Sequence, residues 1–129
     1  MKIERYIYNP IFFPNPRIAW EAEGTFNPGV VKVGKKVYML YRALSYPIKT
    51  NVGILKVSSI GLAESKDGIN FNNRRFFFGP EYDYEAYGCE DPRITKIQGK
   101  IFHLLHCRIK MASNKRGCEG WACNNRRFQ

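Results

Sequence analysis

The residues most able to do chemistry stand together in one short segment, Gly88-Cys89-Glu90-Asp91-Pro92-Arg93. The segment places two carboxyl groups side by side and an arginine two positions later. A neighbouring carboxylate raises the pKa of a carboxyl group and a nearby guanidinium lowers it, so the balance at Asp91 depends on its surroundings. A carboxyl group kept protonated near neutral pH is suited to general-acid work. The structural alternative is that Asp91, directly before Pro92, caps a turn at the start of a strand.

Histidine and cysteine, the usual zinc ligands, gather near the end of the chain without a standard zinc spacing. Cys89 stands apart from this group, which consists of His103, His106, Cys107, Cys118 and Cys123. We therefore expect buried or incidental cysteines and no metal site.

The elements around the acidic segment are predicted to be β-strands joined by tight turns. Aromatic residues make up 15% of the chain and fall in short clusters, which favours strands over helices. Gly34 and the pair Asp67-Gly68 supply the positive φ angles that hairpin turns need. The predicted strands span 30–33, 36–43, 58–65 and 71–78, with a polar loop over 44–57. Such a sheet, apolar on both faces, indicates a propeller blade or one layer of a sandwich.

An internal repeat separates these two architectures. Residues 27–33, Asn-Pro-Gly-Val-Val-Lys-Val, return 64 positions later at 91–97 as Asp-Pro-Arg-Ile-Thr-Lys-Ile. A four-stranded unit that recurs at this period predicts blades around an axis, and equivalent residues of successive blades then face the same central channel. Asn27 and Asp91 are such equivalents in an all-β fold.

The tail departs from this repeat after Lys100 and carries an unusual share of the charge. Residues 101–129 hold 6 Lys and Arg against 1 acidic residue, which is half of the net charge of +10. When residues 101–107 and 120–128 are read one base out of frame, with permitted codons, they return segments that match the first blade. We interpret 101–129 as a divergent basic tail, frame-shifted and poorly ordered. A genuine basic tail is the alternative.

Net positive charge would suit nucleic-acid binding, but its concentration in a frame-shifted tail removes most of that support. The chain opens without the charged, apolar and small-residue order of a signal peptide. No apolar run approaches the ~20 residues that span a bilayer. We expect a cytoplasmic protein that binds neither nucleic acid nor membrane.

Five motifs, taken in their order, resemble the N-terminal motifs of glycoside hydrolase family 130 over about residues 7–100. They are Asn9-Pro10-Ile11 with Trp20-Glu21, Phe26-Asn27-Pro28-Gly29-Val30-Val31, Tyr41-Arg42-Ala43, Ile60-Gly61-Leu62-Ala63 and Gly88-Cys89-Glu90-Asp91-Pro92-Arg93-Ile94-Thr95. The acidic-Pro-Arg motif, combined with the preceding blade, is the specific part. The resemblance implies a five-bladed β-propeller in a longer parent protein, of which this chain holds about one and a half blades. Residues 1–100 would form the N-terminal part of its catalytic domain.

The resemblance also implies an activity. The family's funnel binds a β-linked mannoside, and the Asp of the motif, here Asp91, acts as general acid. In the phosphorylases, inorganic phosphate is the co-substrate; it attacks the anomeric carbon without a general base and releases mannose 1-phosphate, and no cofactor is needed. Substrate contacts are expected from Asn27, Arg42, Glu90 and Arg93. Asn27 is equally suited to holding its turn, and Glu90 to pairing with one of the arginines.

Three functions stay open: a phosphorylase, a β-mannoside hydrolase of the same fold, and a non-catalytic truncated or basic binding protein. The first two share every residue above and differ in a cationic phosphate site, which the family carries on later blades. A full-length parent is compatible with a homo-oligomer. Because one blade alone leaves two apolar faces in water, we expect the isolated chain to be inactive and to aggregate or be poorly ordered.

Overall fold

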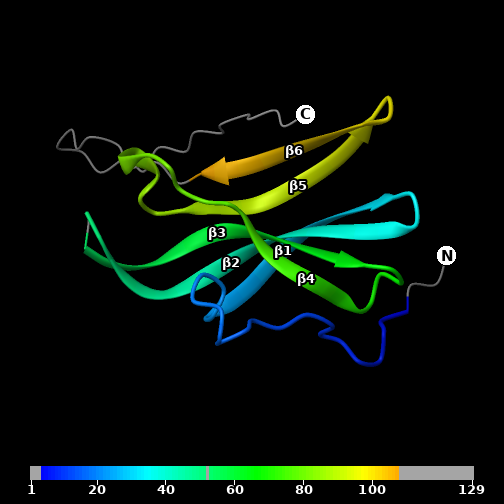
Figure 1. Cartoon of the computed structure of the whole chain (residues 1–129), viewed down its shortest axis with the longest axis horizontal. Helices are drawn as coiled ribbons and strands as arrows, with labels where there is room; N and C mark the ends of the chain where they lie inside the picture. The colour runs from blue at the N-terminus through cyan, green and yellow to red at the C-terminus, as the bar shows by residue number, and fades with distance from the viewer. Residues whose placement is uncertain (1–3, 52, 108–129) are drawn as a thin grey trace.

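The structure, a computed structural model, describes residues 4–51 and 53–107. Four antiparallel strands form one sheet in the order β1-β2-β3-β4, and two further strands form the hairpin β5–β6 (Figure 1). The strands are β1 Gly24–Val33, β2 Lys36–Thr50, β3 Gly53–Ser65, β4 Phe71–Phe78, β5 Cys89–Ile97 and β6 Lys100–Cys107. One short 3-10 turn, η1, covers Asp83–Glu85. The predicted all-β class is confirmed, and no helix within the described residues has the length and apolarity to cross a membrane.

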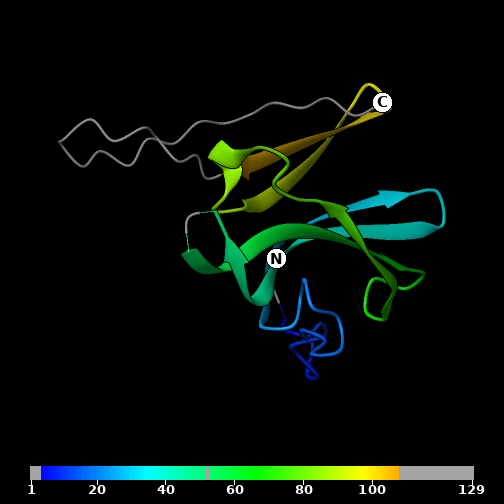
Figure 2. The ribbon, with the colours of Figure 1, turned by 60° about the vertical axis from the view of Figure 1, so that its left-hand side comes forward.

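The four-stranded sheet lies between two covering layers, which Figures 1 and 2 show from two directions. Hairpin β5–β6 packs on one face, where Cys89 and Ile94 meet the apolar side chains of Leu40, Ile60, Leu62 and Phe78. The N-terminal segment, residues 5–22, covers the other face. Its side chains Phe12 and Trp20 meet Met39, Tyr41, Ala43 and Ala63. Neighbouring residues of β2 therefore serve opposite layers, as the alternation of a strand requires.

A buried charge pair fastens the N-terminal segment to the sheet. Glu21, with 0% of its surface exposed, accepts hydrogen bonds from Arg74 Nη1 at 2.9 Å and from Tyr41 Oη at 2.5 Å. Arg74 Nη1 also donates to the carbonyl oxygen of Phe13 at 2.7 Å, and its guanidinium lies 3.8 Å from the ring centroid of Phe12. Burial, and then the Glu21 carboxylate, raise the pKa of Tyr41, so its hydroxyl stays a donor.

This segment corrects the expectation that a single blade leaves both apolar faces in water. Residues 5–22 cover one face and β5–β6 covers the other, so Tyr41 and Leu40 are both about 1% exposed. The sequence prediction treated the chain from residue 27 onward as the blade and gave the preceding residues no partner. Phe12 and Trp20 of that segment pack against the sheet, whereas Tyr6, Tyr8 and Phe13 are exposed.

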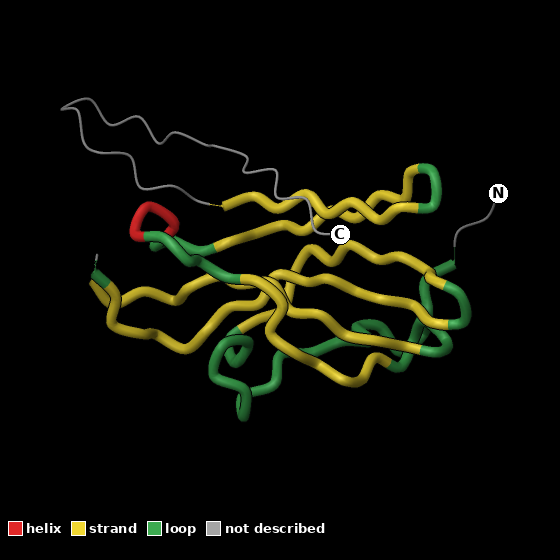
Figure 3. The backbone as a smooth tube through the Cα atoms, turned by 45° about the horizontal axis from the view of Figure 1, so that its top comes forward, coloured by secondary structure: helices red, strands yellow, loops and turns green. Residues whose placement is uncertain are grey.

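The predicted polar loop over 44–57 is wrong. Most of these residues extend β2 and β3 into a long antiparallel arm that is paired out to Thr50 and Gly53, and Figure 3 draws both sides of this arm as strand. A bulge between Leu44 and Pro47 breaks the regular pairing, because Pro47 has no backbone N–H to give. At this bulge the side chain of Ser45 takes over one ladder position, because its Oγ accepts a hydrogen bond from the Val57 N–H at 2.9 Å.

The predicted repeat is confirmed in three dimensions. Hairpin β5–β6 reproduces β1–β2 at the same spacing, with β1 and β5 ending at Val33 and Ile97 and with the same bulge after their second or third residue. Strand β6 spans Lys100–Cys107, so the poor order predicted for 101–129 is wrong for 101–107, which pair with β5. The remainder of that predicted tail, 108–129, lies outside the described residues, and the frame shift stays a prediction.

Candidate functional site

Asp91 and Asn27 sit in matching backbone bulges on adjacent hairpins. The φ angles are 49° at Asp91 and 45° at Asn27, left-handed values that Asn and Asp tolerate better than most residues. Each bulge turns its side chain out of the regular alternation of the strand. The two side chains meet, and Asn27 Nδ2 donates to Asp91 Oδ1 at 2.7 Å. The two residues that the internal repeat identified as equivalent, Asn27 and Asp91, are thus in direct contact.

Arg42 of β2 joins this pair from the neighbouring strand. Its Nη2 lies 2.7 Å from Glu90 Oε1 and its Nη1 lies 3.9 Å from Asp91 Oδ1. The same guanidinium is 5.8 Å from the ring centroid of Phe26, the residue opposite Arg42 in the β1–β2 ladder. Arg42 therefore contacts carboxylates on the next hairpin, and its expected contact with a sugar stays a prediction.

Glu90 is the more enclosed of the two neighbouring carboxylates. Its side chain is 9% exposed against 36% for Asp91. Facing Arg42, Glu90 acts as the partner of an arginine, which is the structural interpretation that the sequence left open. Asp91 keeps an open side that a ligand can reach.

Arg93 is not brought into this cluster. Its neighbour Ile94 packs into the core between the sheet and β5–β6, so Arg93 projects from the opposite face of β5 and is exposed. The other four predicted site residues, Asn27, Arg42, Glu90 and Asp91, lie together where the two hairpins meet. A substrate contact from Arg93 stays a prediction.

Ser58 belongs to the cluster but was missed by sequence reasoning. Its Oγ accepts from Arg42 Nε at 3.0 Å and lies 3.5 Å from Glu90 Oε1. The repeat could not find it, because the repeat compares first strands and Ser58 lies in β3. One signal was available: Gly88, with φ of 96°, would direct a Cβ into the backbone of Ser58, with which it forms a parallel bridge. A glycine before the acidic pair therefore marks a close approach of two segments.

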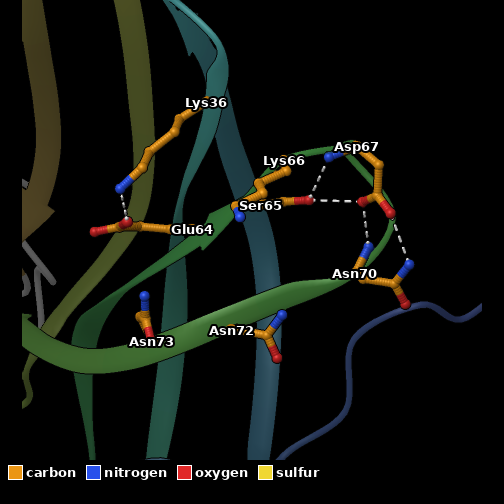
Figure 4. A pocket seen from close by; sticks show the side chains of 8 residues that line it. All are labelled: Lys36, Glu64, Ser65, Lys66, Asp67, Asn70, Asn72 and Asn73. Atoms are coloured by element: carbon orange, nitrogen blue, oxygen red, sulfur yellow. Dashed lines mark hydrogen bonds and ion pairs between the residues drawn. The ribbon is translucent and has the colours of Figure 1, made fainter.

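A second polar cluster lies at the other end of the blade and has a structural explanation (Figure 4). A shallow hollow there is lined by Lys36, Glu64, Ser65, Lys66, Asp67, Asn70, Asn72 and Asn73. Asp67 accepts hydrogen bonds from the Asn70 side chain and from backbone amides of the turn, which hold the pKa of its carboxyl far below the usual range. Lys36 is about 20 Å from Arg42 along an extended strand, so this turn is remote from Asp91.

The absence of a metal site, expected from the sequence, stays a prediction. Among the side chains that the structure describes, no three His, Cys, Asp or Glu are arranged to hold an ion. The side chains of His106, Cys107, Cys118 and Cys123, which belong to the group singled out in the sequence, lie outside the described ones.

Comparison with known proteins gives one consistent family. The model of the glycoside hydrolase 130 family, described as beta-1,4-mannooligosaccharide phosphorylase, matches residues 10–117. A beta-1,2-mannobiose phosphorylase of Thermoanaerobacter sp. (strain X514) is 39% identical over 110 residues, which are 80% of this chain and 36% of the relative. A 1,2-beta-oligomannan phosphorylase of the same strain is 32% identical over 107 residues, 82% of this chain and 36% of the relative.

Solved structures agree with the sequence matches. A glycosyl hydrolase from Bacteroides ovatus superposes with a TM-score of 0.70 at 25% identity, over 95% of this chain and 40% of that one. A second structure has a TM-score of 0.65 at 26% identity, over 93% and 39%. It is described as showing that the GH130 family of mannoside phosphorylases contains glycoside hydrolases that target beta-1,2 mannosidic linkages in Candida mannan. The chain spans little more than a third of the length of these relatives.

Proposed function

The chain belongs to glycoside hydrolase family 130, and on that premise we propose that it forms the N-terminal part of an inverting phosphorylase of β-linked mannosides, with Asp91 as general acid. The family fold is the five-bladed β-propeller, of which this chain holds one four-stranded blade and the first hairpin of the next. We use "complete propeller" for a five-bladed protein that contains this chain as its N-terminal part. Such a protein can come from the parent gene or from joining this chain to the later blades of a Thermoanaerobacter relative.

The observation that carries the proposal is the way the carboxyl group of Asp91 is held. Within the described part of the chain, its contacts with Asn27 and Arg42 both fall on Oδ1. A neutral carboxylic acid needs one oxygen that accepts and one that carries the proton. Oδ1 accepts from Asn27, which leaves Oδ2 to carry the proton.

The reaction follows from this arrangement. An oxygen of inorganic phosphate forms a bond to the anomeric carbon while the glycosidic bond on the opposite side breaks, so a β-mannoside yields α-mannose 1-phosphate. The leaving oxygen receives the proton from Asp91, directly or through a sugar hydroxyl. Asp91 ends as a carboxylate, which the Arg42 cation stabilises. No cofactor takes part.

Phosphate itself must be bound elsewhere. Arg42 is engaged by Glu90 at 2.7 Å and by Ser58 at 3.0 Å, so turning to phosphate would cost it both contacts and take the cation away from a nearly buried carboxylate. The cations that hold phosphate are therefore assigned to the later blades.

The alternative is a hydrolase, which the solved structure describing β-1,2-mannosidases within the family favours as a second candidate. Water, unlike phosphate, needs a base to activate it. Glu90 is unsuited to that task because Arg42 occupies its carboxylate, so a hydrolase would draw its base from the later blades.

The test is product analysis with the complete propeller and β-mannobiose, with and without inorganic phosphate. A phosphorylase releases mannose 1-phosphate and shows no turnover without phosphate. A hydrolase releases mannose whether or not phosphate is present. Asp91→Asn should lower the release of either product about a thousandfold. Asp83→Asn is its matched control and should not, since Asp83 is an exposed carboxylate of η1 outside the cluster. If neither product forms with the unchanged protein, the proposal fails.

A further inference from the structure

Ser58 is the point at which three elements of the site meet. The residue is 1% exposed in β3, and its hydroxyl accepts from Arg42 Nε of β2 at 3.0 Å. The same hydroxyl donates toward Glu90 Oε1 of β5 at 3.5 Å. One oxygen thus joins a cation and a carboxylate that belong to different blades.

We propose that Ser58 is a positioning residue for the general acid and acts on Asp91 through Arg42, an inference that rests on the proposed function. A guanidinium is planar and rigid, so two fixed nitrogens determine where the third lies. Ser58 fixes Nε and Glu90 fixes Nη2 of Arg42. The remaining nitrogen, Nη1, is thereby held 3.9 Å from Asp91 Oδ1.

The backbone of Ser58 also contributes to positioning Asp91. It forms a parallel bridge with Gly88, three residues before Asp91, and a Cβ at position 88 would overlap the Ser58 carbonyl oxygen. Ser58 therefore positions both the cation that faces Asp91 and the chain segment that carries Asp91. This double attachment distinguishes it from an ordinary buried serine.

Loss of the hydroxyl changes the electrostatic surroundings of Asp91 in a defined direction. In the described part of the chain, the groups in contact with Asp91 are the neutral amide of Asn27 and the cation of Arg42, and the carboxylate of Glu90 precedes Asp91 in the chain. Without Ser58 Oγ, Nε of Arg42 loses its acceptor, and the guanidinium turns toward Glu90 and away from Asp91. A more distant cation stabilises less of the negative charge that develops on Asp91 as the proton leaves, so proton transfer becomes slower.

The experiment compares Ser58→Ala, Ser58→Thr and Ser59→Ala in the complete propeller. Ser59 is a matched control, because it is the adjacent buried serine, 4% exposed, and its hydroxyl has no hydrogen-bond partner among the described residues. For Ser58→Ala we expect kcat to fall about tenfold through misplacement of the acid. KM should change less than kcat, because the defect lies in the proton donor and not in the ground-state contacts with the sugar. Ser58→Thr, which keeps a hydroxyl, should restore kcat, and Ser59→Ala should change neither kcat nor KM.

A second readout does not depend on catalysis. The side-chain Nε–H of Arg42, observed by NMR after arginine labelling, should exchange slowly in the unchanged protein and in Ser59→Ala, and rapidly in Ser58→Ala. Equal protection in Ser58→Ala overturns the inference even if the complete propeller cleaves no mannoside. If the protein is active and Ser58→Ala matches Ser59→Ala in kcat and KM, the positioning role fails while the proposed function stands.

Discussion

Arg74→Met is expected to detach the N-terminal segment from the first blade. The change leaves the carboxylate of Glu21, 0% exposed, with Tyr41 as its remaining partner among the described residues, and it removes the hydrogen bond from Arg74 to the Phe13 carbonyl. Removing one partner of a buried ion pair costs about 3–5 kcal/mol. Because Arg74 is itself 22% exposed, the middle of that range, about 4 kcal/mol, is the reasonable expectation.

Amide hydrogen exchange in the complete propeller measures this loss locally. Two amides report on the segment, since Glu21 N–H donates to Ile18 and Tyr46 N–H donates to Ala19. A loss of about 4 kcal/mol corresponds to roughly a thousandfold faster exchange at both amides when exchange follows local opening.

Arg75→Met is the matched control for this prediction. Arg75 is the neighbouring arginine, 59% exposed, with Glu64 at 3.8 Å, and such a surface pair contributes at most ~1 kcal/mol. In the double variant Glu21→Gln with Arg74→Met, the loss should be smaller than the sum of the single losses, because no buried charge is left alone. Equal exchange in Arg74→Met and Arg75→Met would refute the reasoning.

Three further predictions concern single residues of the complete propeller. Gly88→Ala should lower stability by about 2–3 kcal/mol in thermal unfolding, since φ is 96° and the new methyl overlaps Ser58; an unchanged Tm would contradict this. Ser59→Ala should be neutral or stabilising by up to about 1–2 kcal/mol in urea unfolding, because the deleted hydroxyl has no described partner; a clear loss of stability would show a missing partner. Hydrogen bonds from Asn70 and the turn amides depress the pKa of Asp67 from 3.8, so the stability it contributes is present above that pH and lost as the pH falls below it. The difference between the unchanged protein and Asp67→Ala should therefore shrink between pH 7 and pH 2, and a constant difference would count against a role for the charge.

The core of the site was predictable because the chain repeats itself. Matching residues 27–33 with 91–97 identified Asn27 and Asp91 as equivalents, and their side chains are bonded at 2.7 Å. The repeat carries this information because equivalent bulges on adjacent hairpins direct their side chains to the same place. Arg42 came instead from the resemblance, through the motif Tyr41-Arg42-Ala43, and the structure places it beside this pair, opposite Phe26.

The features that the sequence did not predict depend on contacts between segments far apart in the chain, and no local sequence pattern indicates such contacts. The arm over 44–57 contains Ser45, Pro47 and Asn51, which are typical of loops, yet a bulge and the Ser45–Val57 hydrogen bond keep it paired. Glu21 and Arg74 are 53 residues apart, and nothing in the sequence indicates that they meet. Ser58 likewise has no partner within its own strand.

The most direct test of the central claim is the dependence of Asp91→Asn on the leaving group. The amide has the shape of the carboxyl group, and its oxygen can still accept from Asn27, but it cannot donate the catalytic proton. We measure kcat/KM of the complete propeller and of Asp91→Asn with β-mannobiose and with 2,4-dinitrophenyl β-mannoside, whose leaving group needs no proton. The account predicts a loss of about a thousandfold for mannobiose and less than about tenfold for the aryl mannoside. Equal losses for the two substrates, or no loss with mannobiose, would contradict it.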